Sequence, residues 1–226
     1  MTMPTDVILA WSGGKDSTLA LAALNADPSV RVAALLTTVT TGYERISIHG
    51  VRRELLHAQA AALGLRLVEA ELPQRASNEA YERAMADALA RLEQSAPAAR
   101  AVAFGDLFLR DVRAYRERQF ASLGRPLLFP LWGRDTTALG AAFVAEGYQA
   151  TLVCVDTRAL SADYAGRAYD AALLRDLPAG VDPCGENGEF HTFVTAGPLF
   201  EHPVRCARGE VVLRDERFAY CDLVAE

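Results

Sequence analysis

Lysine is almost absent from this chain of 226 residues: 22 of its 23 basic residues are arginine, and the one lysine is Lys15. Arginine's planar fork cannot replace a compact, flexible ammonium where a point charge must reach into a tight loop. Lys15 directly follows the only Gly-Gly pair of the chain, in the segment Ser12-Gly13-Gly14-Lys15-Asp16-Ser17. This placement predicts that the lysine binds phosphate, from a surface loop where it contributes little to stability.

Other absences exclude other classes of protein. No apolar run is long enough to span a bilayer, and the N-terminus lacks a signal-peptide layout, so we expect a cytoplasmic protein with no membrane partner. The net charge is −6 and the basic residues are spread along the chain, which argues against a nucleic-acid surface. The four cysteines show no C-x-x-C spacing and no matching histidine pairs, which predicts free thiols in a reducing compartment: Cys154, Cys184, Cys206 and Cys221.

The residues around Lys15 form a strand–turn–helix pattern that suits an anion. Residues 7–11 are a continuous apolar run, typical of a strand buried on both faces of a parallel sheet. A helix is expected over residues 17–26, with Asp16 or Ser17 as its N-cap. Glycine turn, unpaired N–H groups and helix dipole then converge on one point, where Ser12 and Ser17 add hydroxyl donors.

Two common phosphate-binding motifs do not fit this segment. A Walker A loop needs glycine where Leu9 stands and serine or threonine where Asp16 stands, and no G-x-G-x-x-G occurs anywhere. The segment instead resembles SGGxDS, the PP-loop of the ATP pyrophosphatases. This resemblance implies that ATP is cleaved between its α- and β-phosphates, leaving an adenylated substrate. Lys15 would then stabilise the departing pyrophosphate, and Asp16 would hold Mg²⁺ directly or through water, unless it is a plain N-cap.

Strand-like and helix-like segments alternate after the loop. Apolar runs of strand length recur at residues 30–39, 65–68, 101–104, 126–129 and 151–155. Helical patterns lie between them at residues 51–63 and 77–94, from Asp111 to residue 123, and from Asp135 to Gly147, the two aspartates being expected N-caps. This alternation predicts an α/β fold with a parallel, doubly wound sheet. We expect a nucleotide-binding domain over residues 1–155 and a C-terminal substrate-binding region over residues 156–226.

In such sheets, ligands bind at the carboxyl ends of the strands. Thr37 and Thr38 end the second expected strand, where PP-loop proteins place backbone that reads the adenine edge. Gly105 and Asp106 end the fourth expected strand and offer a close backbone approach and a second carboxylate, although Asp106 could also cap the next turn. His49 precedes a helix, a position that also suits a surface or capping residue. These residues are the expected ATP-binding set together with Ser12, Gly13, Gly14 and Ser17.

A second dense cluster of polar groups lies at residues 182–193, in the run GENGEFHT. A strand that begins there would place Glu189 and His191 on one face, with Phe190 and Thr192 on the other. Glu186, Glu189 and His191 could bind a polar substrate, activate an amine or position a metal, so we expect them to be catalytic. The alternative is a hairpin turn whose charges are solvated.

The SGGKDS and GENGEFHTF segments, with a PLF soon after, resemble the diphthine–ammonia ligase family of N-type ATP pyrophosphatases. The likeness extends over essentially the whole chain, including His49, Gly105-Asp106 and Pro130-Leu131-Trp132. It implies a nucleotide-binding domain of the HUP (adenine nucleotide alpha hydrolase) type with a small family-specific C-terminal region. ATP and Mg²⁺ are the implied cofactors.

The implied reaction is amide formation: a carboxylate is adenylated, and ammonia then displaces AMP. The acceptor acid, borne by a small molecule or by a protein, stays open, since residues 105–108 look like the bacterial branch and bacteria do not make diphthamide. A homo-oligomer is compatible with the sequence. Two other classes are weighed against this ligase. A PP-loop tRNA-modifying enzyme, of thiolase or lysidine synthase type, needs a basic RNA-binding surface, and a thiolase also needs paired catalytic cysteines. A non-catalytic nucleotide sensor lacks SGGxDS and would not need the paired carboxylates of the C-terminal motif.

Overall fold

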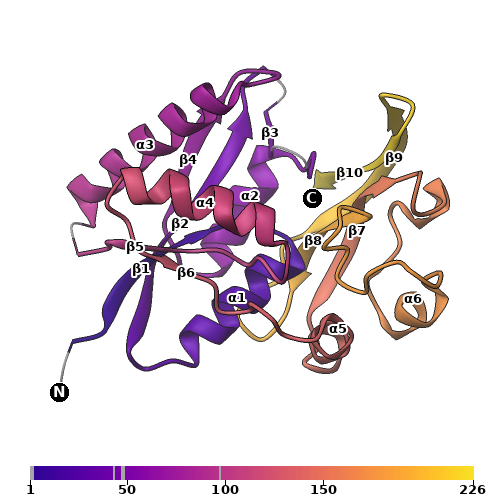
Figure 1. Ribbon diagram of the computed structural model, residues 1–226. Helices are drawn as coiled ribbons and strands as arrows, with labels where there is room; N and C mark the ends of the chain where they lie inside the picture. The colour runs from indigo at the N-terminus through magenta and orange to yellow at the C-terminus, as the bar shows by residue number, and fades with distance from the viewer. Residues whose placement is uncertain (1–2, 43, 47–48, 97) are drawn as a thin grey trace.

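The computed structural model describes residues 3–42, 44–46, 49–96 and 98–226. Its first half is a sheet in which β1 pairs with β2 and β5, β2 with β4, and β5 with β6, all in parallel (Figure 1). The very short β3 runs antiparallel to the end of β2. The strands are β1 (Thr5–Ala10), β2 (Val30–Thr40), β3 (Arg45–Ile46), β4 (Leu67–Leu72), β5 (Ala101–Ala103) and β6 (Leu127–Leu128).

Helices cover both faces of this sheet, because its strands are apolar on both sides. In β1, Val7 and Leu9 belong to one apolar cluster with α1 and α2, whereas Ile8 belongs to a second cluster with α3 and α4. This confirms the expected doubly wound α/β fold of the HUP type. The four helices are α1 (Lys15–Asn25), α2 (Arg53–Ala62), α3 (Asn78–Ser95) and α4 (Arg110–Ser122).

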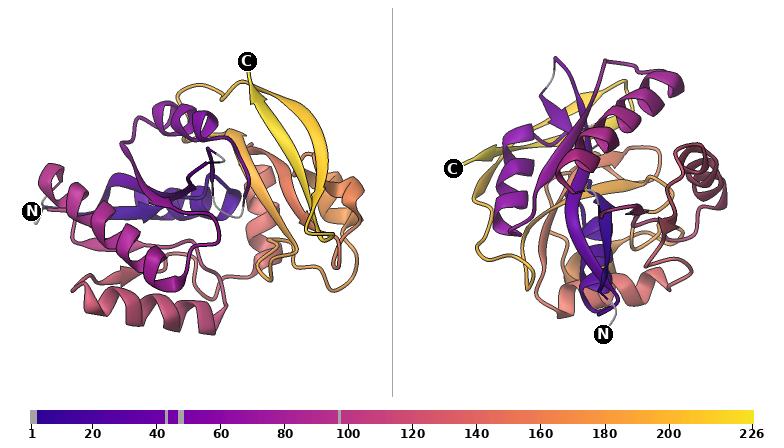
Figure 2. Two further views of the ribbon diagram at one scale, coloured as in Figure 1. Left: turned by 90° about the horizontal axis from the view of Figure 1, so that it is seen from above. Right: turned by 90° about the vertical axis from the view of Figure 1, so that its left-hand side faces the viewer.

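The second half is a separate antiparallel sheet in the order β8-β7-β10-β9, which lies beside the first sheet in Figure 1 and in the left view of Figure 2. Its strands are β7 (Gln149–Asp156), β8 (Phe190–Ala196), β9 (Cys206–Arg214) and β10 (Phe218–Ala225). The remaining helices are α5 (Thr136–Ala145), α6 (Ala171–Asp176) and the short 3₁₀ helix η1 (Ala162–Tyr164). None of the helices in the described ranges is long and apolar enough to cross a membrane.

The expectation that residues 151–155 form a sixth strand of the parallel sheet is wrong. These residues lie in β7, which pairs antiparallel with β8 and β10. An apolar run shows that a strand is buried on both faces, but it does not show which strands are its neighbours. The change of sheet therefore falls between β6 and β7, before the division that we expected at residue 155.

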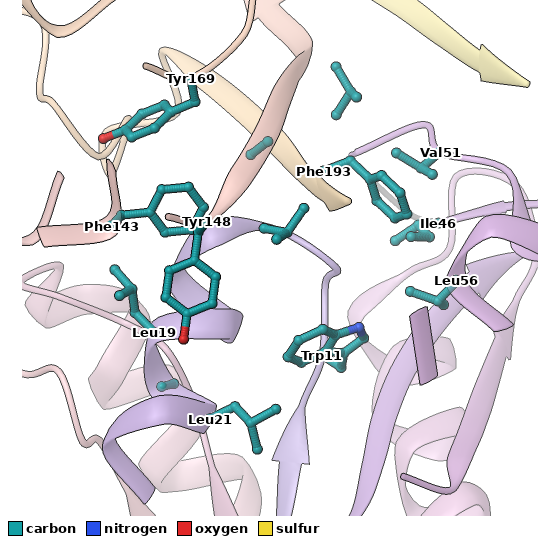
Figure 3. Close-up of a cluster of buried hydrophobic side chains, with 14 of the residues drawn as sticks. Trp11, Leu19, Leu21, Ile46, Val51, Leu56, Phe143, Tyr148, Tyr169 and Phe193 are labelled. Carbon is teal, nitrogen blue, oxygen red and sulfur yellow. The ribbon is translucent and has the colours of Figure 1, made fainter. Parts of the chain in front are cut away.

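Side chains from both sheets form one apolar cluster, which holds the C-terminal half of the chain against the N-terminal half. Figure 3 shows Trp11 and Leu56 from the parallel half close to Phe193 of β8, with Tyr148 on the far side of Trp11. All four side chains are 5% exposed or less. Burial of aromatic side chains of this size is a large stabilising contribution to the contact between the halves.

The expected helix starts are confirmed in part. Asp135 is the N-cap of α5, and its side chain accepts a hydrogen bond from the amide of Ala138. Asp111 is not a cap, because Leu109 precedes α4 and Asp111 lies in the first turn. A carboxylate in a first turn still interacts favourably with the helix dipole, and for that reason the two positions look alike in a sequence.

Candidate active site

A cavity of about 430 Å³ lies at the carboxyl ends of β1, β2 and β5. Gly185, Glu186 and residues 190–192, far away in the sequence, complete its wall. Most of the residues singled out in the sequence line this one cavity: Ser12, Lys15, Asp16, Ser17, Thr37, Thr38, His49, Gly105, Asp106, Glu186 and His191. Gly13, Gly14 and Glu189 do not line it: the two glycines pack against α2 and β8, and Glu189 accepts hydrogen bonds from its own turn.

Helix α1 begins at Lys15, two residues before the start at residue 17 that the sequence predicts. Gly14, in an extended conformation, is the N-cap and no side chain caps the helix, so neither Asp16 nor Ser17 has the capping role that we expected. The hydroxyl groups of Ser12 and Ser17 lie 3.3 Å apart at the cavity wall. Because Lys15 is already the first helical residue, its side chain leaves the helix at the positive end of the dipole.

The ammonium of Lys15 is buried, with only 1% of the residue exposed, which corrects the expectation of a surface lysine. It donates to both carboxylate oxygens of Asp16 at 2.9 Å and to the carbonyl oxygen of Cys184. It also lies 5.8 Å from the ring centroid of Tyr169 and 5.5 Å from that of Phe190, within the range of cation–π attraction. Burial opposes its charge, but Asp16 and other neighbours outweigh burial, and the pKa of Lys15 is raised.

The two glycines of the loop lie behind the cavity, against the second half of the chain. The carbonyl of Gly13 accepts from Gln59 Nε2 and from the amide of Val194, both at 2.9 Å. A Cβ on Gly13 would come within 2.7 Å of Gln59 Oε1, and the φ of +77° also favours glycine. A Cβ on Gly14 would lie 3.0 Å from the carbonyl oxygen of Thr192. The glycines therefore permit close packing of β8 and α2 on the loop.

Gln59 and Thr192 complete this packing. Gln59 has no exposed surface; its Oε1 accepts from the indole of Trp11 at 3.0 Å, and its Nε2 also donates to the carbonyl of Val194 at 2.5 Å. The Thr192 hydroxyl accepts from the amide of Lys15 at 3.0 Å. One of the loop amides that we expected to be unpaired is thus already bonded to β8. The shape of the loop depends on residues more than 40 positions away.

The segment 182–189 is held by its own carboxylates. Glu189 is 7% exposed and accepts from the amides of Asp182 and Asn187 and from the Asn187 side chain, each at 3.0 Å. Asp182 accepts in turn from the amides of Cys184 at 2.8 Å and Glu186 at 3.3 Å. Glu189 thus faces its own turn, whereas His191 lines the cavity, so the two side chains do not share one site as we expected.

Glu186 extends from this segment to the loop after β5. One of its carboxylate oxygens accepts from the amides of Leu107 at 2.8 Å and Phe108 at 3.4 Å. Burial raises the pKa of Glu186 to about 7; the amides of Leu107 and Phe108 oppose this rise, and Asp16 and Asp106 add to it. A carboxyl group with such a pKa can accept or donate a proton near neutral pH, which suits general acid–base catalysis.

His191 and His49 lie next to each other in the cavity wall, with ring centroids 4.6 Å apart and a tilt of 42°. Burial and the nearby Lys15 lower the pKa of His191 to about 4. His191 is therefore a neutral hydrogen-bonding group at neutral pH rather than a second cation beside the lysine.

The end of the cavity on β2 fits a nucleotide. Thr37 and Thr38 line it together with the apolar Ala10, Leu36 and Ile46. The hydroxyl of Thr37 is buried and has no hydrogen-bond partner in the described part of the chain. A buried hydroxyl without a partner costs free energy, and a polar edge of a bound ligand would remove that cost.

Asp106 and Gly105 have structural partners as well as places in the wall. Asp106 pairs with Arg116 of α4 through two hydrogen bonds of 2.6 and 3.1 Å, and the Arg116 guanidinium lies 4.2 Å from the ring centroid of Phe104. A Cβ on Gly105 would lie 2.9 Å from the carbonyl oxygen of Asp16, so the close backbone approach is to α1. Arg116 has no local sequence signal and could not be predicted. Gln59 is a polar residue on the apolar face of α2, beside Leu55 and Leu56, and that placement is a signal that could have identified it.

The metal-binding capacity of the cavity is limited. Within the described ranges, no group of three histidine, cysteine, aspartate or glutamate side chains could hold a metal by itself. Asp16 is a suitable single ligand: its side chain is 31% exposed, burial raises its pKa, Lys15 opposes that shift and Asp182 adds to it. Mg²⁺ bound with a nucleotide takes most of its ligands from phosphates and water, so one carboxylate is enough.

Burial raises the pKa of the Cys184 thiol to about 12, so this cysteine is no thiolate nucleophile.

Comparisons with known proteins agree with this architecture. Residues 5–125 match a family model described as the diphthamide synthase N-terminal domain, and residues 135–223 match the diphthamide synthase C-terminal domain. A curated relative, the diphthine–ammonia ligase of Danio rerio, is 35% identical over 101 residues, which are 42% of this chain and 39% of that protein. The chain thus matches about two fifths of the length of that relative.

Proposed function

This chain belongs to the diphthamide synthase family, and we propose that it is an ATP-dependent ligase that adenylates a carboxylate and then forms an amide with ammonia. One observation carries the proposal: Lys15 and Asp16 share a cavity with Glu186 and His191, although about 170 residues separate the two segments. A group that binds the phosphates of ATP and a group that moves a proton are what such a ligase must hold side by side.

Binding of ATP would use the two ends of the cavity. The hydroxyl groups of Ser12 and Ser17 and the ammonium of Lys15 are suited to the phosphates, and Thr37 to a polar edge of the nucleoside. To reach a phosphate, the ammonium must exchange the Cys184 carbonyl for phosphate oxygen. Asp16 would hold Mg²⁺, which neutralises phosphate charge when bound.

In the first step, an oxygen of the acceptor carboxylate attacks the α-phosphorus, and the bond from this phosphorus to the bridging oxygen of the β-phosphate breaks. Pyrophosphate leaves with the bonding electron pair, and Lys15 stabilises its charge. In the second step, the nitrogen of ammonia attacks the acyl carbon, and the bond to the AMP oxygen breaks. Glu186 accepts the proton that the new amide nitrogen loses, which its pKa of about 7 permits. Glu189, bonded to its own turn, positions Glu186 rather than touching a substrate.

Separation of the nucleotide products by anion-exchange chromatography tests this proposal. The protein is incubated with Mg²⁺ and ATP, alone and with ammonium chloride and a panel of carboxylic acids. We expect AMP and pyrophosphate in equal amounts, slowly with water as the acceptor and faster with a true acid. With an ¹⁸O-labelled acid, one label should appear in AMP. Formation of ADP and phosphate in place of AMP would contradict the proposal.

A further inference from the structure

A second hollow, of about 910 Å³, lies outside the ATP cavity, between the β9–β10 hairpin and the segment that links β2 to α2. We call it the hairpin cleft. Alternate residues over most of the two strands line it, so one face of the hairpin forms most of a wall: Glu210, Val212, Arg214, Tyr220, Asp222 and Val224. The hairpin forms the outer edge of the second sheet, where β10 pairs with β7 (Figure 2).

The hairpin cleft adjoins the candidate active site. Ile46, which is 3% exposed, lines both hollows. Thr37 and Thr38 lie in the wall of the ATP cavity, and Thr40 of the same strand lies in the wall of the cleft. A molecule in the cleft therefore lies at the same end of β2 as the nucleotide, with the β3 segment between them.

The charge of the cleft is opposite to that of the whole protein. Four arginines line it against three carboxylates, whereas the chain has a net charge of −6. Arg45 donates one hydrogen bond of 2.8 Å to Asp222, and Arg52 donates two, of 3.2 and 2.7 Å. Arg75 and Arg214 are exposed, and within the described ranges neither forms an ion pair. Two guanidinium groups at the rim are thus available to an anionic partner.

The hairpin also offers backbone and apolar surface. β9 pairs with β10 on one side and, within the described residues, with no strand on the other, so its outer edge has N–H and C=O groups for an added strand. Val212 and Val224 in the cleft wall are 40% and 37% exposed, and Val211 and Leu213 on the opposite face are 41% and 56% exposed. Exposed valine and leucine on an open edge strand suit a polypeptide, which can add a strand to the edge, better than RNA, which cannot.

We propose that the hairpin cleft binds an extended, acidic polypeptide segment, with Arg75 and Arg214 binding its carboxylates and β9 binding its backbone. The inference rests on the proposed function in one respect: a polypeptide held there can present an acceptor carboxylate to the ATP cavity past Ile46. Docking itself needs neither ATP nor turnover, and the two can be tested separately.

Fluorescence anisotropy of labelled probes tests the docking surface. The probes are a decapeptide of alternating glutamate and valine, the corresponding lysine–valine peptide and a ten-nucleotide oligouridine. Wild-type protein is compared with the Arg75→Glu/Arg214→Glu variant. The matched control is Arg83→Glu/Arg118→Glu, which makes the same charge change at exposed arginines of α3 and α4. Thermal unfolding confirms that each variant is folded, and Arg75→Ser/Arg214→Ser replaces the first variant if it is not.

We expect the acidic peptide to bind wild type and the control alike, and the cleft variant at least tenfold more weakly. The lysine peptide should bind none of them. Equal binding of the acidic peptide to the cleft variant and the control, tighter binding of the oligouridine, or no peptide binding to wild type would each overturn the inference. Product analysis without peptide reports separately on the ligase, so ADP formation would contradict the proposed function and leave the docking result standing.

Discussion

Two loops meet at Lys15, and they are held in different ways. The loop at residues 12–17 is fixed from outside, by Gln59, Thr192 and the amide of Val194. The segment 182–189 is fixed in large part from within, because Asp182 and Glu189 accept hydrogen bonds from its own amides. Its outside contacts come from other elements: Thr136 donates to Asp182, Tyr169 to the Pro183 carbonyl, and the Leu107 amide to Glu186. The Lys15 ammonium joins them through the Cys184 carbonyl.

This difference assigns the two loops different tasks. A loop held from outside keeps its shape only while β8 and α2 are packed on it, so the phosphate site and the C-terminal half must form together. A loop held from within can keep its shape while its contact with Lys15 changes. A change in the Lys15–Cys184 contact, when the ammonium turns to a phosphate, therefore leaves the turn intact, and Glu186 keeps its bonds to the amides of Leu107 and Phe108.

The largest expected effect is at Lys15, where the two loops meet. Lys15→Met removes the ammonium but keeps most of the buried stem, and the rate of AMP formation should fall by about 10²–10³ because the pyrophosphate charge loses its partner. The variant should also unfold more easily, by about 1–3 kcal/mol, since the Cys184 carbonyl and Asp16 lose a buried donor. Product analysis and denaturant unfolding measure the two effects.

Lys15→Arg is the matched control, because it keeps the charge. The guanidinium fork should not fit between Asp16 and the Cys184 carbonyl, and turnover should stay low. Wild-type rates in Lys15→Met would remove Lys15 from the mechanism. An unchanged unfolding free energy would show instead that the contact with Cys184 does not join the two loops.

The next largest effect is expected at Gln59, which supports the loop at residues 12–17 from outside. Gln59→Leu keeps the volume but removes two donated hydrogen bonds and leaves the Trp11 indole without its acceptor. The KM for ATP should rise by about tenfold, as the loss of about 1.4 kcal/mol implies, with a lower melting temperature. Steady-state kinetics and thermal unfolding measure both.

Gln119→Leu provides the comparison, since Gln119 is 7% exposed and neither of its amide atoms has a partner in the described structure. Removing an amide that makes no hydrogen bond should leave the KM unchanged and the melting temperature equal or higher. If Gln59→Leu behaves like Gln119→Leu, the loop keeps its shape without outside support and the comparison between the two loops fails.

The contrast between support from a segment's own residues and support from distant residues also separates what the sequence could predict from what it could not. The strands of the parallel sheet follow from apolar runs that each precede a helix, and the cavity residues follow from their places at strand ends. The partner of β7 could not be predicted, because pairing is a contact between distant segments. The support from Gln59 and the inward turn of Glu189 were missed for the same reason: each depends on a partner that no local pattern names.

The smallest expected effect tests the loop that is held from within, through the pKa of Glu186. If Glu186 is the base, its carboxylate form is active, so at constant free ammonia the rate should rise with pH through a midpoint near 7, and Glu186→Gln should abolish this rise. Glu189→Gln weakens the turn, admits water to Glu186 and so reduces the main cause of its raised pKa. The midpoint should then move down by about one unit or less, with ATP affinity unchanged. Glu201→Gln, at an exposed site, should not move it. A pH–rate profile of the three variants decides the matter, because a midpoint that stays near 7 in Glu189→Gln would mean that the turn does not control the burial of Glu186.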